Sequence, residues 1–132
     1  MLILDLDDTI FETKSMNPKI FDEAIDIIKN YYTDREEATD SEKVIQALWS
    51  IPVDEVFTKY KTEEYIKAKY YKKIAEIDYT NLNIETFHDY PVLKEINMDK
   101  ILVTTGLKEL QQAKIKALGI GADFKQIHID DP

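Results

Sequence analysis

Three short apolar runs predict β-strands near the two ends of the chain. The first is residues 2–6 (Leu-Ile-Leu-Asp-Leu), and the others are residues 101–104 and 126–130. Apolar runs of this length are typical of strands buried on both faces of a parallel sheet. Between the last two runs, apolar side chains at helical spacing over 107–118 stop at a glycine, which predicts an amphipathic helix. This helix and the two later strands are expected to form one β-α-β unit.

The stretch between the first two strands has a helical pattern and is about 95 residues long, far more than a crossover needs. One helix is expected to start at Asn17 and to lose its pattern in the polar stretch 33–40. A second is expected after a cap at Ser41, and a third runs from a cap at Thr62 to about residue 77. The side chains expected to face inward are Ile20, Ala24, Ile27, Ile28, Tyr31, Val44, Ile45, Leu48, Trp49, Tyr65, Ile66, Tyr70 and Ile74.

The pattern divides the chain into an α/β core over 1–14 and 83–132 and a helical insert over 15–82. The insert begins just past the first strand, and open α/β sheets bind ligands at the carboxyl ends of their strands. That position suits a lid that excludes water and selects substrate. The tyrosines of the insert have two interpretations that the sequence leaves open: bundle core, or the wall of a substrate pocket.

Three carboxylates, Asp5, Asp7 and Asp8, follow the first strand. Acids placed together at the end of a buried strand repel one another and cost desolvation energy, so they add nothing to stability. They make sense around a divalent cation, and oxygen ligands of this kind suit Mg²⁺. If the strand continued, Asp5 and Asp7 would share one face. The alternative is a solvated acidic loop in which Asp8 forms a turn.

The segment Asp5-x-Asp7-x-Thr9, followed by two apolar residues, resembles motif I of the haloacid dehalogenase (HAD) superfamily. The resemblance implies that Asp5 is a nucleophile that forms an aspartyl-phosphate and that Asp7 is the general acid/base. It also implies that the Asp5 side chain and the Asp7 backbone carbonyl hold Mg²⁺. The chemistry is reasonable, because a carboxylate attacks phosphorus without prior deprotonation and the metal neutralises charge between two anions.

The segment Val103-Thr104-Thr105-Gly106 is similar to motif II of the same superfamily. The resemblance implies that the Thr104 hydroxyl and the backbone N–H groups of Thr105 and Gly106 hold the phosphoryl group, as a strand-to-helix turn can. Taken alone, Thr-Thr-Gly would be a common turn. The long insert matches a cap between motifs I and II. The implied fold class is α/β, an incomplete Rossmann-like HAD core of about three parallel strands with an inserted all-helical cap.

The chain departs from the family pattern at its C-terminal end. The family has a lysine after the third strand (motif III) and acidic residues after a fourth (motif IV), and residues 130–132 end the chain before either. Lys114 and Lys116 could reach the site, but they are interpreted as solvated helix lysines. Asp130 and Asp131 come too early in the fold to be the missing acidic pair. We therefore expect a truncated chain, or one completed by another segment or subunit.

Charge and composition exclude several classes of function. Acidic residues number 26 against 17 basic ones, a net charge of -9, which disfavours nucleic acid and anionic membranes as partners. Apolar runs fall short of the ~20 residues that cross a bilayer, and the N-terminus lacks a basic leader. The absence of cysteine excludes disulfides, thiolate zinc sites and a cysteine nucleophile. A cytoplasmic protein is expected.

Two hypotheses of function follow. The first is a Mg²⁺-dependent phosphatase that hydrolyses a small phosphorylated metabolite through an aspartyl-phosphate. Asp7 favours phosphate chemistry, because dehalogenases of the superfamily do not keep an acid two residues after the nucleophile, and a mutase stays open. The second is a truncated or catalytically incomplete HAD-like module that binds metal, phosphate or a partner without turnover.

Overall fold

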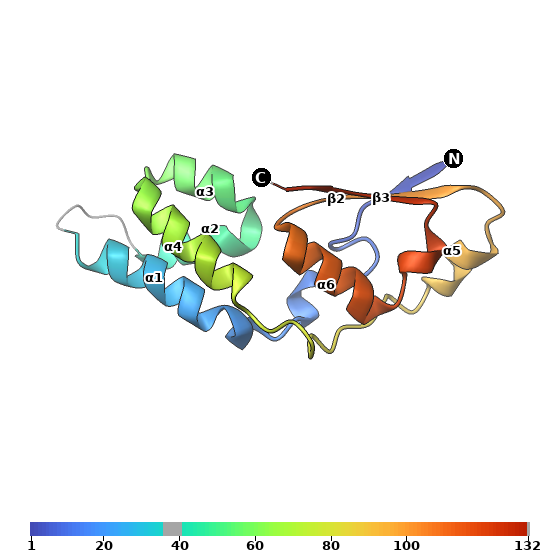
Figure 1. Ribbon diagram of the computed structural model, residues 1–132, viewed down its shortest axis with the longest axis horizontal. Coiled ribbons are helices and arrows are strands. Elements are labelled where there is room, and N and C mark those ends of the chain that lie inside the picture. Colours follow the sequence, from blue (N-terminus) through green and yellow to red (C-terminus); the bar gives the residue numbers. More distant parts are fainter. Residues whose placement is uncertain (36–40, 132) are drawn as a thin grey trace. The chain divides into compact units, whose positions relative to one another are not determined.

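A parallel sheet joins the two ends of the chain (Figure 1). Strand β1 (Leu2–Leu4) pairs with β2 (Lys100–Thr105), and β2 pairs with β3 (Gln126–Asp130), in the order β1-β2-β3. The structure is a computed structural model and describes residues 1–35 and 41–131. It divides into two units, one formed by Met1–Asn17 with Asp78–Pro132 and the other by Pro18–Ile77.

The sheet register brings the carboxyl ends of neighbouring strands together. Leu4 lies opposite Leu102, and Thr104 lies opposite Ile129. Segments that follow β1 and β2 therefore leave the sheet at one edge, where ligands bind in open α/β sheets. The strands predicted at 101–104 and 126–130 are confirmed.

Helix α6 (Lys108–Leu118) follows β2 and covers one face of the sheet. It ends at Gly119, whose φ of 67° is left-handed and whose N–H donates to the Lys116 carbonyl at 3.1 Å. A glycine adopts this conformation without the Cβ clash that other residues meet. The predicted helix and β-α-β unit are confirmed.

The other face of the sheet is open among the described residues. Leu102 is 0% exposed, but Ile3 on β1 is 60% exposed and Val103 on β2 is 41% exposed. The prediction that the first strand is buried on both faces is therefore wrong. The helix of one β-α-β unit can cover only one face of the sheet. A short apolar run does not distinguish a strand covered on one face from a strand covered on both. The strand also ends at Leu4, earlier than the predicted residue 6.

Three short helical segments complete the first unit: η1 (Thr13–Ser15), α5 (Pro91–Glu95) and η3 (Gly121–Asp123). The Tyr90 hydroxyl, just before α5, donates to Asp123 Oδ2 at 2.9 Å. The buried apolar side chains of this unit include Leu6, Ile10, Phe11, Leu82, Ile84, Tyr90, Leu102, Ile115, Ile120 and Phe124.

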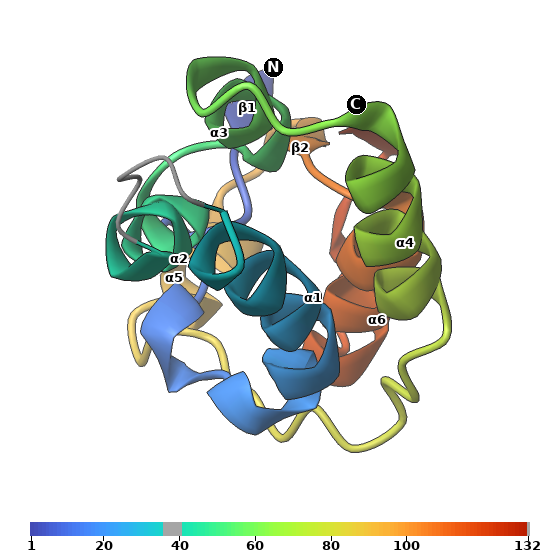
Figure 2. The ribbon, with the colours of Figure 1, turned by 90° about the vertical axis from the view of Figure 1, so that its left-hand side faces the viewer.

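The second unit is helical in its described part, as the pattern predicted. Helix α1 lies beside α4 and also packs against α2 (Figure 2). Its elements are η2 (Pro18–Phe21), α1 (Asp22–Thr33), α2 (Ser41–Ser50), α3 (Val53–Lys59) and α4 (Glu64–Ala75). Its buried apolar side chains include Ala24, Ile28, Tyr32, Val44, Val56, Phe57, Ile66, Tyr70 and Ile74. Residues 36–40 of the predicted polar stretch lie outside the described residues.

Two side chains expected in the core of this unit are exposed. Trp49 is 48% exposed, and its ring meets Phe21 edge-on at a centroid distance of 5.7 Å. Trp49 is the second-last residue of α2, and at this end of the helix its side chain stays partly exposed. Tyr65 is 55% exposed and lies in the first turn of α4.

The predicted cap at Thr62 is also wrong. Helix α4 begins after Glu63, without a side-chain cap. The Thr62 hydroxyl instead shares a 2.5 Å hydrogen bond with the hydroxyl of Tyr32, and both side chains are buried. Tyr32 rather than the predicted Tyr31 is therefore the tyrosine of α1 that enters the core, because its hydroxyl finds a buried partner there.

Candidate active site

A tight turn after β1 positions the acidic segment. The Leu6 carbonyl accepts a hydrogen bond from Ile10 N–H at 3.0 Å, and Asp8 N–H donates to the Phe11 carbonyl at 2.9 Å. Asp8 has a φ of 57°, a left-handed conformation that aspartate tolerates better than most residues. Its carboxylate accepts the Thr13 N–H at 2.9 Å. Asp8 is therefore the turn-forming acid of the three.

The Asp7 carboxylate is held by three donors. Lys114 Nζ lies 2.7 Å from Oδ1, and Gln111 Nε2 lies 2.9 Å from Oδ2. The Thr13 hydroxyl donates to Oδ1 at 3.3 Å. The side chain of Asp7 keeps 28% of its surface exposed. The carboxylate is thus fixed at both oxygens and still reachable from solvent.

Gln111 connects this carboxylate to the end of β2. Its Nε2 also lies 2.7 Å from the Thr104 hydroxyl and 3.3 Å from the Thr105 carbonyl. Gln111 is 1% exposed and Thr104 2% exposed. An amide nitrogen carries two hydrogens, so one of them is shared among these acceptors. The residues resembling motifs I and II therefore meet through one amide group of α6.

Gly106 permits this approach. Its φ is 149°, and a Cβ at this position would lie 3.0 Å from Gln111 Cδ. A side chain here would require the Gln111 side chain to shift. The Gly106 N–H donates to the Asp130 carbonyl at 3.0 Å. The predicted phosphate-binding role of the Thr105 and Gly106 N–H groups stays a prediction, and for Gly106 it would require this bond to open.

Asp5 lies apart from these contacts. Its side chain is exposed, and its Oδ1 accepts the Leu6 N–H at 2.7 Å. The strand that would have put Asp5 and Asp7 on one face ends at Leu4, and the Asp7 carboxylate turns toward α6. The Gln111 amide connects Asp7 to Thr104, whereas the Asp5 carboxylate is accessible from solvent.

Lys114 corrects one expectation. It was predicted to be a solvated helix lysine, but it is 4% exposed and forms an ion pair with Asp7, whereas Lys116 is exposed as expected. Sequence reasoning also missed Gln111. The signal was present, because Leu107, Gln111, Lys114 and Leu118 follow the i, i+4, i+7, i+11 spacing of one helix face. Two polar residues inside an apolar stripe indicate a buried polar site.

The oxygen donors near Asp5 suit a hard cation, but they would fill only some of its coordination positions. Among the described residues, no group of three or more histidine, aspartate or glutamate side chains could hold a metal ion. The Asp5 carboxylate and the Asp7 carbonyl are oxygen donors, and Mg²⁺ often takes one or two protein carboxylates with water and substrate phosphate. The Asp7 carboxylate is already bonded to Lys114, so the backbone carbonyl is the atom of Asp7 that fits the metal.

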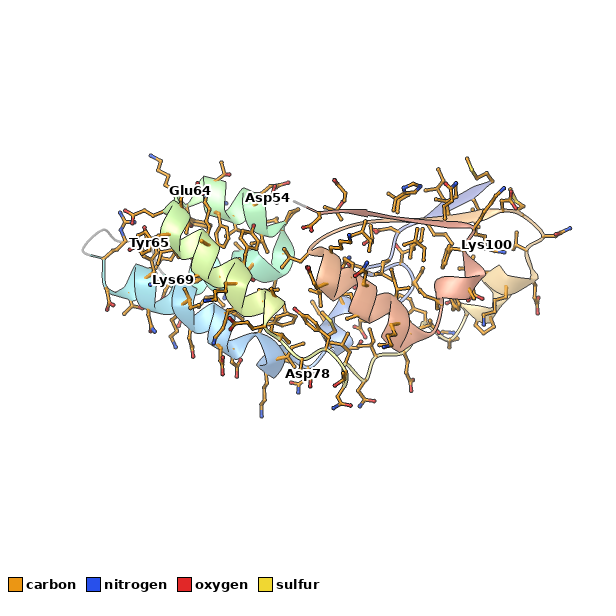
Figure 3. All side chains as sticks on the ribbon, viewed as in Figure 1. Asp54, Glu64, Tyr65, Lys69, Asp78 and Lys100 are labelled. Atoms are coloured by element: carbon orange, nitrogen blue, oxygen red, sulfur yellow. The ribbon has the colours of Figure 1, made fainter. Side chains whose placement is uncertain are left out.

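A separate hollow of about 550 Å³ lies in the second unit. Tyr31 and Tyr65 line it together with Arg35 and Lys69, and Figure 3 labels Tyr65 and Lys69 on α4. Lys69 Nζ stands 5.6 Å from the centroid of the Tyr65 ring. The two interpretations of the tyrosines thus divide between residues: Tyr32 and Tyr70 are core, and Tyr31 and Tyr65 border a hollow.

Comparison with solved structures identifies the fold. One similar structure is a haloacid dehalogenase-like family hydrolase from Xanthomonas campestris, with a TM-score of 0.51 and 13% identity. Another, from Thermotoga maritima and provisionally described as a β-phosphoglucomutase, has a TM-score of 0.51 and 12% identity. In both cases the match covers 97% of this chain and 60% of the other.

The chain therefore has the α/β fold of HAD-superfamily hydrolases, with an incomplete Rossmann-like core of three parallel strands. It spans about three fifths of the length of these structures. No protein-family model matches the sequence, and a search of curated proteins finds no match. None of the described helices is long and apolar enough to cross a membrane.

Proposed function

We propose that this chain carries the active site of a Mg²⁺-dependent phosphatase that hydrolyses a small phosphorylated metabolite through an aspartyl-phosphate. The observation that supports it best is the Gln111 amide, 2.9 Å from Asp7 Oδ2 and 2.7 Å from the Thr104 hydroxyl. The Asp7 carboxylate and the Thr104 hydroxyl are thereby connected through one amide group, and Asp5, two residues before Asp7, is exposed. A solvated acidic loop would not need a buried amide and a buried lysine.

In the first step, a carboxylate oxygen of Asp5 attacks the phosphorus of the ester. The bond between phosphorus and the leaving oxygen breaks as the new oxygen–phosphorus bond forms, giving an aspartyl-phosphate. Asp7, carrying a proton on the edge of the carboxyl group that Lys114 and Gln111 leave open, gives it to the leaving oxygen, so an alcohol departs rather than an alkoxide. Asp5 is exposed, so an ester can reach its carboxylate.

In the second step, water attacks the phosphorus of the aspartyl-phosphate. Asp7, now ionised, takes a proton from the water, and the Asp5 carboxylate leaves as inorganic phosphate forms. The enzyme returns to its starting protonation state. The Thr104 hydroxyl, whose oxygen accepts a hydrogen bond from Gln111 Nε2, is the side-chain donor proposed to bind the transferring phosphoryl group.

The Asp5 carboxylate and the Asp7 backbone carbonyl would hold Mg²⁺. When bound, the ion neutralises charge between the attacking carboxylate and the phosphoryl group. A mutase would share the first step and pass the phosphoryl group to another hydroxyl of the substrate instead of water. Phosphate release separates the two, because a mutase conserves the phosphate ester.

The test is phosphate release from a panel of small phosphate esters, with Mg²⁺ and with a chelator, by the wild-type chain and by Asp5→Asn. We expect release that needs both Mg²⁺ and Asp5. The matched control is Asp99→Asn, which removes another exposed acid of the same unit, one that pairs with Lys125 at 2.8 Å. Equal release by wild type and Asp5→Asn would contradict the proposal.

A further inference from the structure

A lysine and a glutamine are buried on α6 where the fold has no need of them. Lys114 is 4% exposed and Gln111 1% exposed. Burying an ammonium group costs desolvation free energy, and a buried ion pair is often no more stable than apolar residues of the same volume. Apolar side chains at these two positions would extend the stripe of Leu107 and Leu118. The polar pair is therefore better explained by what it holds than by stability.

We propose that Gln111 and Lys114 are positioning residues that fix the Asp7 carboxylate for proton transfer and hold the Thr104 hydroxyl beside it. This inference rests on the proposed function and deepens it. Family resemblance pointed to the motif segments themselves, whereas these two residues act through them from the middle of the following helix.

The two donors fix the carboxylate plane. Lys114 donates to Oδ1 at 2.7 Å and Gln111 to Oδ2 at 2.9 Å, so rotation about the Cβ–Cγ bond would break both hydrogen bonds. The solvent-exposed edge of the carboxylate is therefore held in one orientation. Proton transfer is sensitive to such orientation, because donor and acceptor must approach within hydrogen-bond distance along a fixed line.

The donors are themselves fixed. Gln111 and Lys114 stand three positions apart on α6, so they project from one face of a hydrogen-bonded helix. Lys114 Nζ also lies 5.7 Å from the centroid of the Phe11 ring, which is fully buried beneath the turn. Sites built on helices are more precise than sites built on loops. Asp7 lies in a loop, and α6 supplies the precision that the loop lacks.

The inference makes a prediction that depends on the leaving group. A general acid matters most when the leaving oxygen is basic, as in an alkyl phosphate, and least when it departs easily, as in p-nitrophenyl phosphate. Misplacing Asp7 should therefore slow the alkyl ester much more than the nitrophenyl ester. Loss of folded protein alone would lower both rates by the same factor.

The experiment measures kcat and KM for these two esters with Lys114→Met and Gln111→Leu. The matched controls are Lys116→Met and Gln112→Leu, which replace the same residue types at exposed positions of the same helix. In kcat/KM, which reports the steps up to formation of the aspartyl-phosphate, we expect the two site variants to lose about 10–100-fold on the alkyl ester and a few-fold on the nitrophenyl ester, as for partial loss of general acid catalysis. The controls should match wild type on both esters.

Four results would overturn the inference. Equal losses in kcat/KM on both esters would mean a purely structural role. A raised KM with unchanged kcat would mean that Lys114 binds the phosphate directly rather than acting through Asp7. If the wild-type chain releases no phosphate from either ester, the proposed function fails and this inference fails with it. If wild type is active, Asp5→Asn is inactive and Lys114→Met equals wild type, the inference alone fails.

Discussion

Replacing Gly106 by alanine tests the close approach on which the site depends. The wild-type φ of 149° is a conformation that L-residues rarely adopt, and the new Cβ would lie 3.0 Å from Gln111 Cδ and 3.3 Å from its Nε2. The backbone term is worth about 1–3 kcal/mol. Displacing the amide from Thr104 adds roughly 1 kcal/mol for one lost hydrogen bond between buried groups. We expect Gly106→Ala to lower the free energy of unfolding by about 2–4 kcal/mol.

The two other glycines provide matched controls. Gly119 has a φ of 67° with no atom within 4 Å of a built Cβ, so alanine there should cost about 1–2 kcal/mol from the backbone alone. At Gly121 a Cβ would meet Ile115 at 3.7 Å, an ordinary contact, and the change should stay within about 0.5 kcal/mol. The assay is urea unfolding of the three variants, followed by circular dichroism.

The contact term can be isolated with a double variant. If the alanine methyl at Gly106 acts by pushing Gln111, then Gly106→Ala should cost less in a Gln111→Ala background, by about the 1 kcal/mol assigned to the displaced hydrogen bond. A Gly106→Ala variant no less stable than Gly119→Ala, or fully additive effects in the double variant, would refute the reasoning.

Three other predictions concern the cores of the two units. Tyr32→Phe should cost about 1–3 kcal/mol, because it leaves the buried Thr62 hydroxyl without its 2.5 Å partner, whereas the half-buried Tyr31→Phe should cost less in the same urea titration. Phe57→Ala should cost about 3–5 kcal/mol, because Phe57 is 1% exposed and its loss leaves a cavity in the core; the measurement is thermal unfolding. Burial and the hydrogen bond to Asp123 raise the pKa of Tyr90 above its usual value of 10.0, so its contribution to stability is fully present below about pH 10 and is lost as the pH rises further. The stability difference between wild type and Tyr90→Phe should therefore stay constant up to about pH 10 and shrink as the pH rises above it, and a difference that stays constant above pH 10 would contradict the assignment.

The strands and helix of the β-α-β unit were predictable because local periodicity determines them. The spacing over 107–118 and the following glycine gave the helix its correct end at Leu118. The first strand was read correctly as a strand and wrongly as doubly buried. Whether Ile3 is covered depends on what packs against the sheet, and a run of apolar letters contains no information about a second layer.

The motif residues were also visible in sequence, whereas their supports were not. Asp7 and Thr104 stand in recognisable segments of the sequence. Gln111 and Lys114, which hydrogen-bond to them, could be found only by considering the apolar and polar positions of one helix face together. Lysine side chains are usually solvated, and this general tendency favours an exposed Lys114 although the helical spacing places it on the buried face. Thr62 does not cap the helix, because its hydrogen bond with Tyr32 in the core outweighs the local preference of threonine for helix caps.

The measurement that tests the account most directly is the mass of the covalent intermediate. The chain would be incubated with Mg²⁺ and p-nitrophenyl phosphate, quenched in acid within a turnover, and digested for peptide mass analysis. The account predicts one added phosphoryl group on the peptide that contains Asp5, removed by hydroxylamine as an acyl phosphate is, and none in Asp5→Asn. Phosphate release by the wild-type chain with no phosphoryl group on Asp5, or with one on another residue, would contradict it.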